Sequence, residues 1–308
     1  MKFQTKRQLK IRQFIPLMLM TVPGVLYLII NNYIPMFGII IAFKNIDYAK
    51  GILGSDWIGL KNFEFLFRTR DALVITRNTV LYNIAFILIM LVASVTIAIL
   101  LNEVRIKKLA RIYQSVILLP YLISMVIVGY LVFSLLSLET GMMNRTILPA
   151  LGIPEIMWYS EPKYWPFILT LVNIWKNTGY LCVIYYAAII GIDREMYEAA
   201  DIDGASKWQQ VIRITLPMLK QVIIVMTMLQ IGRIFYSDFG LFYQVPMNAG
   251  ALSSTTNVID TYVYRALLNL GDISMASAAG VYQSIVGFIL VMAANALVRK
   301  IDPENAMF

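Results

Sequence analysis

Residues 198–217 read EAADIDGASKWQQVIRITLP, and this polar stretch lies between two long apolar runs. Gly204 can take the left-handed conformation that ends a helix, and Pro217 suits the first turn of the helix that follows. The stretch therefore predicts two short helices around a glycine hinge. Three small residues would let another surface approach closely: Ala199, Ala200 and Ala205. Composition alone fits an ordinary loop equally well.

The composition of the whole chain indicates a membrane protein. Of the 308 residues, 59% are hydrophobic and 14% are charged, whereas soluble domains average about 45–50% apolar and about 25% charged residues. This excess is too large for one buried core. The net charge of +8 then concerns membrane topology, and the absence of an arginine-rich helix with interleaved aromatic residues argues against a nucleic-acid partner.

Several kinds of chemistry are excluded by the residues that are missing. Histidine is absent, which removes the commonest metal ligand and general base. The single cysteine, Cys182, lies in an apolar run and is predicted to be a packed hydrophobic residue. The sequence has no G-x-x-x-x-G-K phosphate loop. We predict no catalytic site, no metal site and no cofactor in this chain.

Six apolar runs predict an all-α integral membrane protein. Each has about 20 residues, which at about 1.5 Å per residue crosses about 30 Å of hydrocarbon. The predicted spans are residues 14–34, 78–101, 113–136, 165–190, 217–237 and 278–298, so 14–298 form one transmembrane domain. The first run could be a signal peptide, but its length, two prolines and lack of a small-x-small cleavage site favour a retained span. Pro120 predicts a kink in the third span.

The basic residues predict the orientation of these spans. Lys and Arg concentrate in residues 1–13, in the turn after the second span and in residues 191–220, and two more follow the last span. The positive-inside rule places these segments in the cytoplasm, including the tail 299–308. The loop 35–77 disagrees, because it carries six basic residues, but it also carries acids and is long enough to weaken the rule. Residues 191–216 are therefore predicted to be cytoplasmic.

The spacing within the opening stretch resembles the EAA motif of the membrane subunits of bacterial ABC importers. That motif is EAA, three residues, G, nine residues and I-x-L-P, which Glu198, Gly204 and Ile214 reproduce in register. Its position between the fourth and fifth of six spans also fits the type I importer (MetI-like) permease fold. A further segment, with Pro35, Ala42-Phe43 and 57–63, is similar to the beginning of carbohydrate-importer permeases, and the subgroup it resembles is the LplB type.

The resemblance implies that residues 191–216 form a coupling helix region seated in a groove of a cytoplasmic ATPase dimer, which would bind the ATP and magnesium. The residues it assigns to coupling are Glu198, Ala199, Ala200, Asp203, Gly204, Ala205, Leu216 and Pro217. It further implies a second homologous permease that completes a heterodimer and an extracytoplasmic solute-binding lipoprotein that delivers an oligosaccharide. The location implied is the bacterial inner (cytoplasmic) membrane, with multi-pass topology and surrounding lipids.

Polar residues inside the spans that flank the motif are the candidate substrate site. In the fourth span these are Asn173, Lys176, Asn177 and Tyr180, and in the fifth span Gln230, Arg233 and Ser237. Their spacing of three, four and seven residues would place each set on one helical face. Polar groups in a membrane are costly and indicate function. The two cations could bind an acidic sugar, pair with an acid of the partner permease, or extend to the membrane interface.

Other functions are also open to this scaffold. An importer of peptides or amino acids would share the coupling motif, although the LplB-like segment favours sugars. A membrane enzyme acting on lipid-linked sugars would need surface carboxylates with a matching base, which the sequence does not offer. A membrane scaffold without transport would not require Lys176 and Arg233 within its spans.

Overall fold

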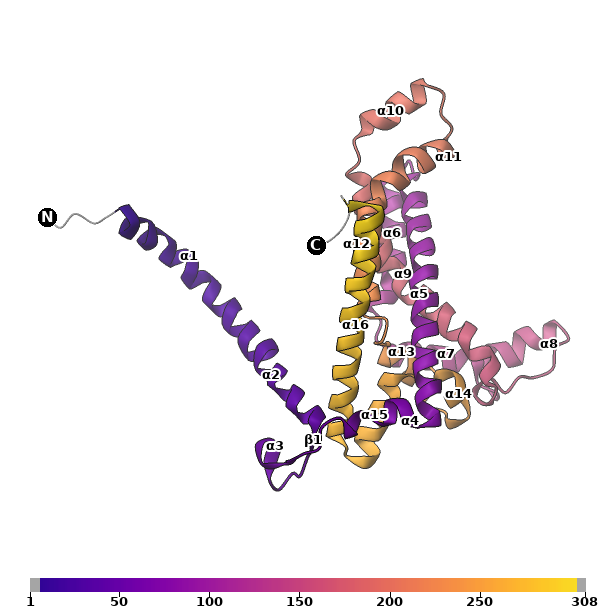
Figure 1. Cartoon of the computed structure of the whole chain (residues 1–308). Coiled ribbons are helices and arrows are strands. Elements are labelled where there is room, and N and C mark those ends of the chain that lie inside the picture. The colour runs from indigo at the N-terminus through magenta and orange to yellow at the C-terminus, as the bar shows by residue number, and fades with distance from the viewer. Residues whose placement is uncertain (1–5, 304–308) are drawn as a thin grey trace. The chain divides into compact units, whose positions relative to one another are not determined.

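The computed structural model describes residues 6–303 and is mostly helical (Figure 1), which confirms the predicted fold class. Residues 1–5 and 304–308, the outer ends of the predicted cytoplasmic segment and tail, lie outside the described residues. The chain folds into two units. One consists of Met1–Phe65 with Ala266–Val281, and the other of Leu66–Arg265 with Tyr282–Phe308.

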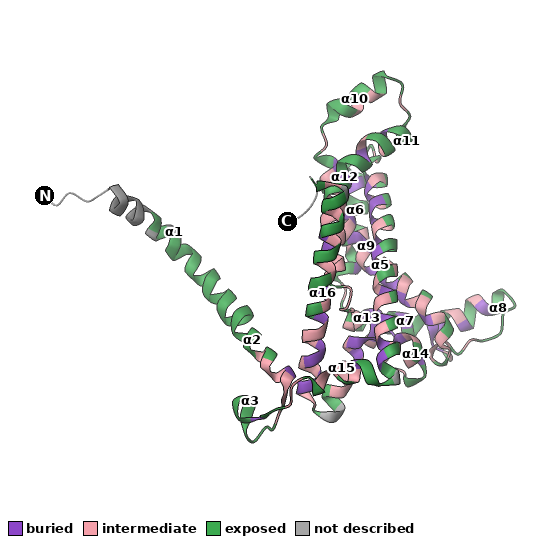
Figure 2. Cartoon of the chain, viewed as in Figure 1, coloured by how far each residue is buried: buried purple, intermediate pink, exposed green. Residues whose placement is uncertain are grey.

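The first unit begins with a long apolar helix. Helix α1 (Lys6–Leu28) continues through a π-helical turn (Ile29–Tyr33), α2 (Ile34–Met36) and a 3-10 turn (Phe37–Phe43). From Met18 to Phe43 this element is apolar and long enough to cross a membrane. Its side chains are largely exposed, as the green colouring in Figure 2 shows. An exposed apolar helix of this length requires lipid or another apolar surface around it.

A short hairpin follows α1 in the same unit. Strands β1 (Lys44–Asn45) and β2 (Asp56–Trp57) pair antiparallel, with α3 (Gly51–Gly54) between them. The sequence motif of this segment closes the hairpin, because Phe43 stacks on Trp57 with ring centroids 5.7 Å apart. Asn62 donates hydrogen bonds of 2.9 Å to the carbonyl oxygens of Ala42 and Lys44. The residues that suggested the LplB type therefore form one small aromatic unit.

The second unit is built on two long antiparallel helices. Helix α4 (Phe65–Arg68) precedes α5 (Arg70–Asn102), which Thr69 caps by accepting a hydrogen bond from the Ala72 amide. Helix α9 (Trp165–Ile190) packs along α5. Their contact buries Cys182 and Tyr185 among aliphatic side chains of α5 and α12. Cys182 is thus a packed hydrophobic residue, as its sequence context predicts.

The third predicted span is broken rather than kinked. Helix α6 (Lys107–Leu122) ends two residues after Pro120, and α7 (Met125–Leu136) starts at a bend of 95°. The side chain of Ser124 caps α7 by accepting a hydrogen bond from the Ile127 amide. Beyond α7 a π-helical turn (Met143–Ile147), α8 (Leu148–Ala150) and two 3-10 turns (Trp158–Ser160, Pro162–Tyr164) lead to α9.

The fifth predicted span also differs from the expected helix. Helix α10 (Arg194–Ile202), α11 (Lys207–Gln210) and a π-helical turn (Val211–Thr215) lead into α12 (Leu216–Ile231), which ends six residues before the predicted limit at Ser237. The backbone then runs through turns to α13 (Phe239–Gln244). A 3-10 turn (Gly250–Leu252), α14 (Ser253–Thr256), α15 (Ile259–Leu270) and α16 (Ile273–Ile301) complete the chain.

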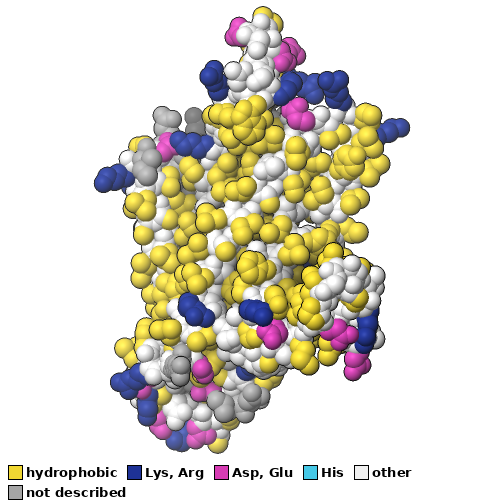
Figure 3. All heavy atoms as spheres, turned by 90° about the vertical axis from the view of Figure 1, so that its right-hand side faces the viewer, with side chains coloured by type: hydrophobic (Ala, Val, Ile, Leu, Met, Phe, Trp, Pro, Cys, Tyr) yellow, Lys and Arg dark blue, Asp and Glu magenta, His cyan; other side chains and the backbone are white. Residues whose placement is uncertain are grey.

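Helix α12 stops at a point where it packs closely against α16. A Cβ atom on Gly287 of α16 would lie 2.6 Å from the carbonyl oxygen of Gly232, so the two backbones meet there directly. Glycine is also a poor residue for a helix interior. Counting the bent α6–α7 pair as one, up to six elements of the described chain are long and apolar enough to cross a membrane. The space-filling view has a broad hydrophobic face (Figure 3).

Candidate coupling segment and intramembrane polar site

The opening stretch of the sequence folds as the predicted pair of short helices. Helix α10 begins after Asp193, whose carboxylate accepts a hydrogen bond of 3.1 Å from the Glu195 amide. It ends at Ile202, and Gly204, two residues beyond, has a φ of +76°. The Ala205 amide donates to the carbonyl oxygen of Ala200 at 2.9 Å, and the Gly204 amide to that of Asp201 at 3.1 Å. These two bonds form a Schellman C-cap, which needs the left-handed residue that glycine supplies.

The second short helix is fixed by its own cap. Ser206 and Gln209 form a capping box at the start of α11, in which each side chain bonds the backbone of the other. The carboxylate of Asp201 accepts a hydrogen bond from Gln210 and lies 3.5 Å from the Lys207 ammonium. Side-chain contacts across the turn therefore stabilise the α10–α11 hairpin.

One side chain ties α10 to the membrane helix beyond it. The hydroxyl of Tyr197 lies 2.9 Å from that of Thr215, which is buried at the start of α12. Pro217 occupies the first turn of α12, as the sequence predicts. A displacement of α10 would therefore be transmitted to α12 through side-chain and backbone contacts.

The outer surface of this hairpin is available for contact. Helix α10 projects from the helical unit in Figure 1, and in Figure 2 most of it is exposed. Glu198 and Gly204 are both exposed, and within residues 6–303 the Glu198 carboxylate has no hydrogen bond or ion pair. Ile202 and Trp208 are 86% and 71% exposed. An unpaired carboxylate beside exposed apolar side chains is suited to docking a soluble partner.

The remaining predicted coupling residues share this environment. Ala199, Asp203, Leu216 and Pro217 are exposed, and Ala200 and Ala205 are partly buried. All belong to α10, its C-cap or the first turn of α12. The structure therefore places the predicted coupling residues in one braced segment.

Lys176 of the fourth span lies at the break in the third. It is only 7% exposed, and its ammonium donates hydrogen bonds to the carbonyl oxygens of Pro120 at 3.1 Å and Tyr121 at 3.0 Å. It also donates to the carbonyl oxygen of Ile123. A helix leaves its last carbonyl groups without internal partners. Lys176 supplies those partners for α6, which makes an abrupt bend at membrane depth tolerable.

A pair of tyrosines stands beside this junction. Tyr121 and Tyr180 stack with ring centroids 4.8 Å apart and an angle of 13° between their planes. They are 41% and 44% exposed, so one side of the pair is open. Nearby on α9, Asn177 donates a hydrogen bond of 2.8 Å to Asn173, which is buried. The open side of this cluster thus consists of aromatic faces and a partly exposed amide.

The other predicted polar set does not share one helical face. Gln230 is in the last turn of α12, but Arg233 and Ser237 follow the helix end in the turn segment. The sequence interpretation was wrong about that shared face, because α12 ends at Ile231 and glycine at position 232 is a poor residue for continuing it. Gln230 and Ser237 are partly buried, whereas Arg233 is exposed. No hydrogen bond or ion pair engages the Arg233 guanidinium in the described part of the chain.

A buried carboxylate organises this turn segment. Asp260 of α15 accepts a hydrogen bond of 2.8 Å from the Ser237 amide and another from Gln283 of α16 at 3.3 Å. Gln283 also donates to the carbonyl oxygen of Phe235 at 2.6 Å. Burial raises the pKa of Asp260, and the hydrogen bonds from Ser237 and Gln283 oppose that rise. The hydroxyl of Ser237 is enclosed and has no partner among the described residues.

The two polar sets therefore face different neighbours. The contacts of Lys176 and Tyr180 run to the α6–α7 break, and those of Phe235 and Ser237 run to α15 and α16. Sequence reasoning missed Tyr121, Asp260 and Gln283. A signal for Tyr121 was present, because it directly follows the kink-forming Pro120. Asp260 and Gln283 lie far from Ser237 in sequence, and no spacing rule links them.

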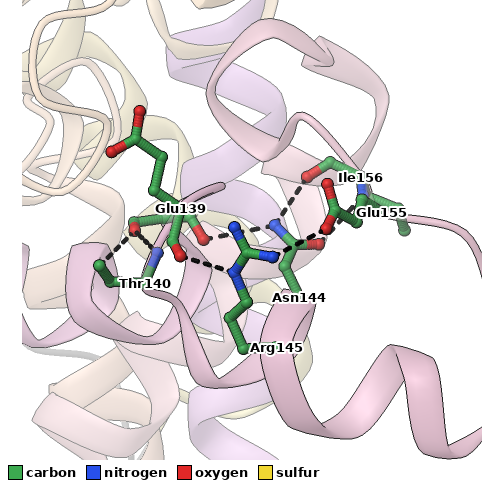
Figure 4. Close-up of polar contacts among 7 residues, drawn as sticks. Glu139, Thr140, Asn144, Arg145, Glu155 and Ile156 are labelled. Carbon is green, nitrogen blue, oxygen red and sulfur yellow. Dashed lines mark hydrogen bonds and ion pairs between the residues drawn. The ribbon is translucent and has the colours of Figure 1, made fainter.

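The loop between α7 and α9 is rigidly held (Figure 4). The guanidinium of Arg145 donates to the carbonyl oxygen of Glu139 at 2.6 Å and to the Glu155 carboxylate at 3.2 Å. Buried Asn144 exchanges two hydrogen bonds of 3.0 Å with the backbone of Ile156. Beside this network lies a groove of about 430 Å³ whose lining includes Trp158 and Tyr159. The loop thus presents a preformed surface.

Comparison with known proteins identifies this architecture. The model of the family "binding-protein-dependent transport system inner membrane component" matches residues 77–303. The chain belongs to this family. The match covers the segment from α5 to α16, including the α10–α11 hairpin and both broken spans. This confirms the resemblance that the EAA motif indicated.

Individual relatives extend over nearly the full length of this permease. It is 38% identical over 289 residues to the polygalacturonan/rhamnogalacturonan transport system permease protein YteP of Bacillus subtilis, covering 94% of this chain and 89% of that protein. It is 35% identical over 290 residues to protein LplB of the same organism, covering 94% and 90%. The similarity to the LplB type inferred from residues 42–63 is thereby confirmed.

A solved structure of the same architecture is also similar to this permease. It is a bacterial ABC transporter involved in the import of the acidic polysaccharide alginate, with a TM-score of 0.84 and 31% identity over 95% of this chain and 98% of that one. A second structure of an alginate transporter, with a periplasmic protein bound to an alginate pentasaccharide, gives 0.83 and 30% over 95% and 96%. The chain is a multi-pass membrane permease of the ABC importer type.

Proposed function

We propose that this permease moves oligosaccharides or polysaccharide fragments into the cytoplasm by alternating access, driven by a separate ATPase. The observation that carries the proposal is the exposed, braced α10 hairpin with its unpaired Glu198 carboxylate and left-handed Gly204. An ATPase dimer that closes on ATP would push this hairpin. The contact between Tyr197 and Thr215 would pass the movement to α12.

Acidic saccharides are the substrate class that the relatives and one exposed cation favour. Relatives are named for polygalacturonan and rhamnogalacturonan transport and for alginate import, and polygalacturonan and alginate are both carboxylate-bearing polymers. Arg233 is an exposed cation without an internal partner in the described residues. A guanidinium pairs with a carboxylate through two parallel hydrogen bonds, which suits it to a uronate group.

The remaining predicted substrate residues fall into two groups, those that are open or partly exposed and those that are buried. The open stacked pair of Tyr121 and Tyr180 offers an aromatic face against which a sugar ring can pack. Asn177 is partly exposed beside it, and Ser237 carries an enclosed hydroxyl without a partner in the described chain. We assign these, with Arg233 and Gln230, to the substrate path. Lys176 and Asn173 are buried and would act by holding the path in shape.

The partners follow from the same proposal. The ATPase would bind ATP and magnesium, and this chain would hold neither. A second, homologous permease would complete the pore, and a solute-binding lipoprotein would dock on extracytoplasmic loops such as 138–163. A structure that includes a periplasmic binding protein is known for the alginate relative. With the basic segments on the cytoplasmic side, both termini would be cytoplasmic.

Uptake by the complete importer in proteoliposomes tests the substrate class. The cognate binding protein is first screened against acidic and neutral oligosaccharides, peptides and amino acids. We expect ATP-dependent uptake of an acidic oligosaccharide, and Arg233→Met should reduce that uptake at least tenfold while Arg233→Lys retains part of it. Uptake of a peptide or amino acid instead, or normal acidic-sugar uptake by Arg233→Met, would overturn the substrate assignment.

A further inference from the structure

A basic cavity opens beside the base of α10. It has a volume of about 490 Å³, which is within the range of about 300–1,000 Å³ typical of small-ligand sites. Its walls come from the end of α5, the first turns of α6 and the end of α9, and Arg194 of α10 completes it. The polar lining residues are Asn102, Arg105, Lys107, Arg111, Gln114 and Arg194.

The charge of this cavity is unbalanced. Four cations line it, and no carboxylate is among the described residues of its lining. Within residues 6–303, Arg105, Lys107, Arg111 and Arg194 make no ion pair or side-chain hydrogen bond. Elsewhere in the same unit Lys207 pairs with Asp201 and Lys220 pairs with Asp302. Like charges converging on one cavity repel one another unless an anion lies between them.

The N-terminus of α6 also favours an anion in this cavity. This 16-residue helix begins at Lys107 after Ile106, which provides no side-chain cap, and its first turn contains no acid. A helix N-terminus carries partial positive charge and free amide groups, so basic residues there are unfavourable by themselves. An anion in the cavity would relieve both the cation cluster and the uncapped helix end.

The surroundings of the cavity indicate which anion. Ala110, Tyr186 and Ile190 form its apolar wall. Along α6 from the cavity the side chains of Ile112, Tyr113 and Val116 are 46–61% exposed, and they form part of an apolar surface. Figure 3 shows dark-blue Lys and Arg side chains near the end from which α10 projects, next to a broad hydrophobic face. A ligand with a phosphate group and apolar chains fits both the basic cavity and the apolar surface along α6.

We infer that this cavity binds the phosphate headgroup of an anionic phospholipid, whose acyl chains lie along α6. Arginine is suited to phosphate through paired hydrogen bonds, and basic pockets between membrane helices on the cytoplasmic side typically hold anionic headgroups. Because Arg194 belongs to α10 and the other cations to the α5–α6 connection and the first turns of α6, one headgroup would join the coupling helix to the core. This consequence for coupling rests on the function proposed above, but the lipid site does not.

The test uses the purified complete importer and two double variants. Arg105→Gln with Arg111→Gln removes two cations of the cavity. Arg299→Gln with Lys300→Gln removes two exposed cations at the end of α16 that do not line it. Native mass spectrometry measures retention of phosphatidylglycerol and of phosphatidylcholine. Thermal unfolding is followed with each lipid and with inorganic phosphate.

We expect the wild-type importer to retain phosphatidylglycerol in preference to phosphatidylcholine. The cavity variant should lose at least tenfold of this preference, since each basic residue near an anionic headgroup contributes about 1 kcal/mol. The α16 variant should keep it. In liposomes, phosphatidylglycerol should raise the ATP hydrolysis of the wild type more than that of the cavity variant.

Four results would overturn the inference. Equal retention of the two lipids by the wild type, or equal loss in both double variants, would show that the cavity is not selective. Protection by inorganic phosphate equal to that by phosphatidylglycerol would indicate a free-anion site. Loss of the ATPase from the cavity variant with unchanged lipid retention would mean that the cations contact an acidic protein surface. Lipid retention needs no transported substrate, so failure of the transport proposal would be seen separately.

Discussion

The ammonium of Lys176 donates a hydrogen bond of 3.1 Å to the carbonyl oxygen of Pro120, which joins the fourth membrane helix to the broken end of the third. Two further carbonyl groups, those of Tyr121 and Ile123, share the same donor. A cation at membrane depth that sequence reasoning assigns to a sugar therefore has a structural task in this permease. It stabilises the 95° bend between α6 and α7.

Replacing Lys176 should destabilise the permease. Lys176→Met removes the side-chain donor of three carbonyl groups at the bend. That of Pro120 is buried and also accepts from the Ile123 amide, and the other two are partly buried. Each unsatisfied buried polar group costs about 1–3 kcal/mol, less where relaxation finds new partners. We expect the unfolding temperature of the purified importer to fall by several degrees. Tyr180→Phe is the matched control, since it keeps the aromatic stack one turn away. Unchanged unfolding of Lys176→Met would exclude this structural role.

The conformation of Gly204 predicts a graded effect of substitution. Its φ of +76° is costly for most side chains, and a Cβ atom there would meet nothing within 4 Å, so the penalty is conformational rather than steric. Gly204→Asn should keep the Schellman cap better than Gly204→Val, because asparagine tolerates the left-handed region. Hydrogen exchange of the α10 amides measures this. Equal protection in the two variants would contradict the assigned cap.

The close contact between α12 and α16 can be tested with two substitutions on α16. Gly287→Ala would place a methyl group 2.6 Å from the carbonyl oxygen of Gly232, and the two elements would have to separate. Gly280→Ala adds the same atom to α16 where nothing lies within 4 Å. We expect the first variant to lower the unfolding temperature and the second to leave it unchanged or raise it, because alanine favours helix. Similar changes in both would argue against the close contact.

Asp260 predicts a dependence of stability on pH. Burial raises its pKa above the ordinary value of 3.8, so the folded permease favours the protonated carboxyl group. The stability that this proton provides is present below the ordinary pKa and is lost as pH rises through the raised one. The unfolding temperature of the wild type, relative to that of Asp260→Asn, should therefore fall as pH increases above about 4. Parallel pH profiles for the two proteins would exclude this contribution.

Local rules explain why the coupling segment could be predicted from sequence. Gly204 and Pro217 act on the backbone within a few residues of themselves, and their roles do not depend on distant contacts. The EAA spacing adds a family resemblance to those rules. The fold class follows in the same way from the length and apolar character of each run.

Long-range contacts explain what the sequence could not show. Pro120 predicts a kink. The hydrogen-bond donor that stabilises the complete break between α6 and α7 is the ammonium of Lys176, 56 residues away. Its partners are backbone carbonyl groups, which every residue has, so no complementary residue marks the pair. The close contact at the end of α12 involves Gly287, which is 55 residues from Gly232, and the run up to Ser237 remains apolar enough to resemble a span. Both cases involve contacts between helices.

Co-purification of the ATPase with the permease tests the central claim most directly. Glu198→Lys reverses an unpaired charge on the exposed face of α10, and Glu139→Lys makes the same change in the loop after α7, where only the backbone of Glu139 bonds to Arg145. If α10 is the seat of the ATPase, Glu198→Lys should lower the ATPase recovered per permease at least tenfold, and Glu139→Lys should leave it at the wild-type level. Full recovery of the ATPase with Glu198→Lys would contradict the account.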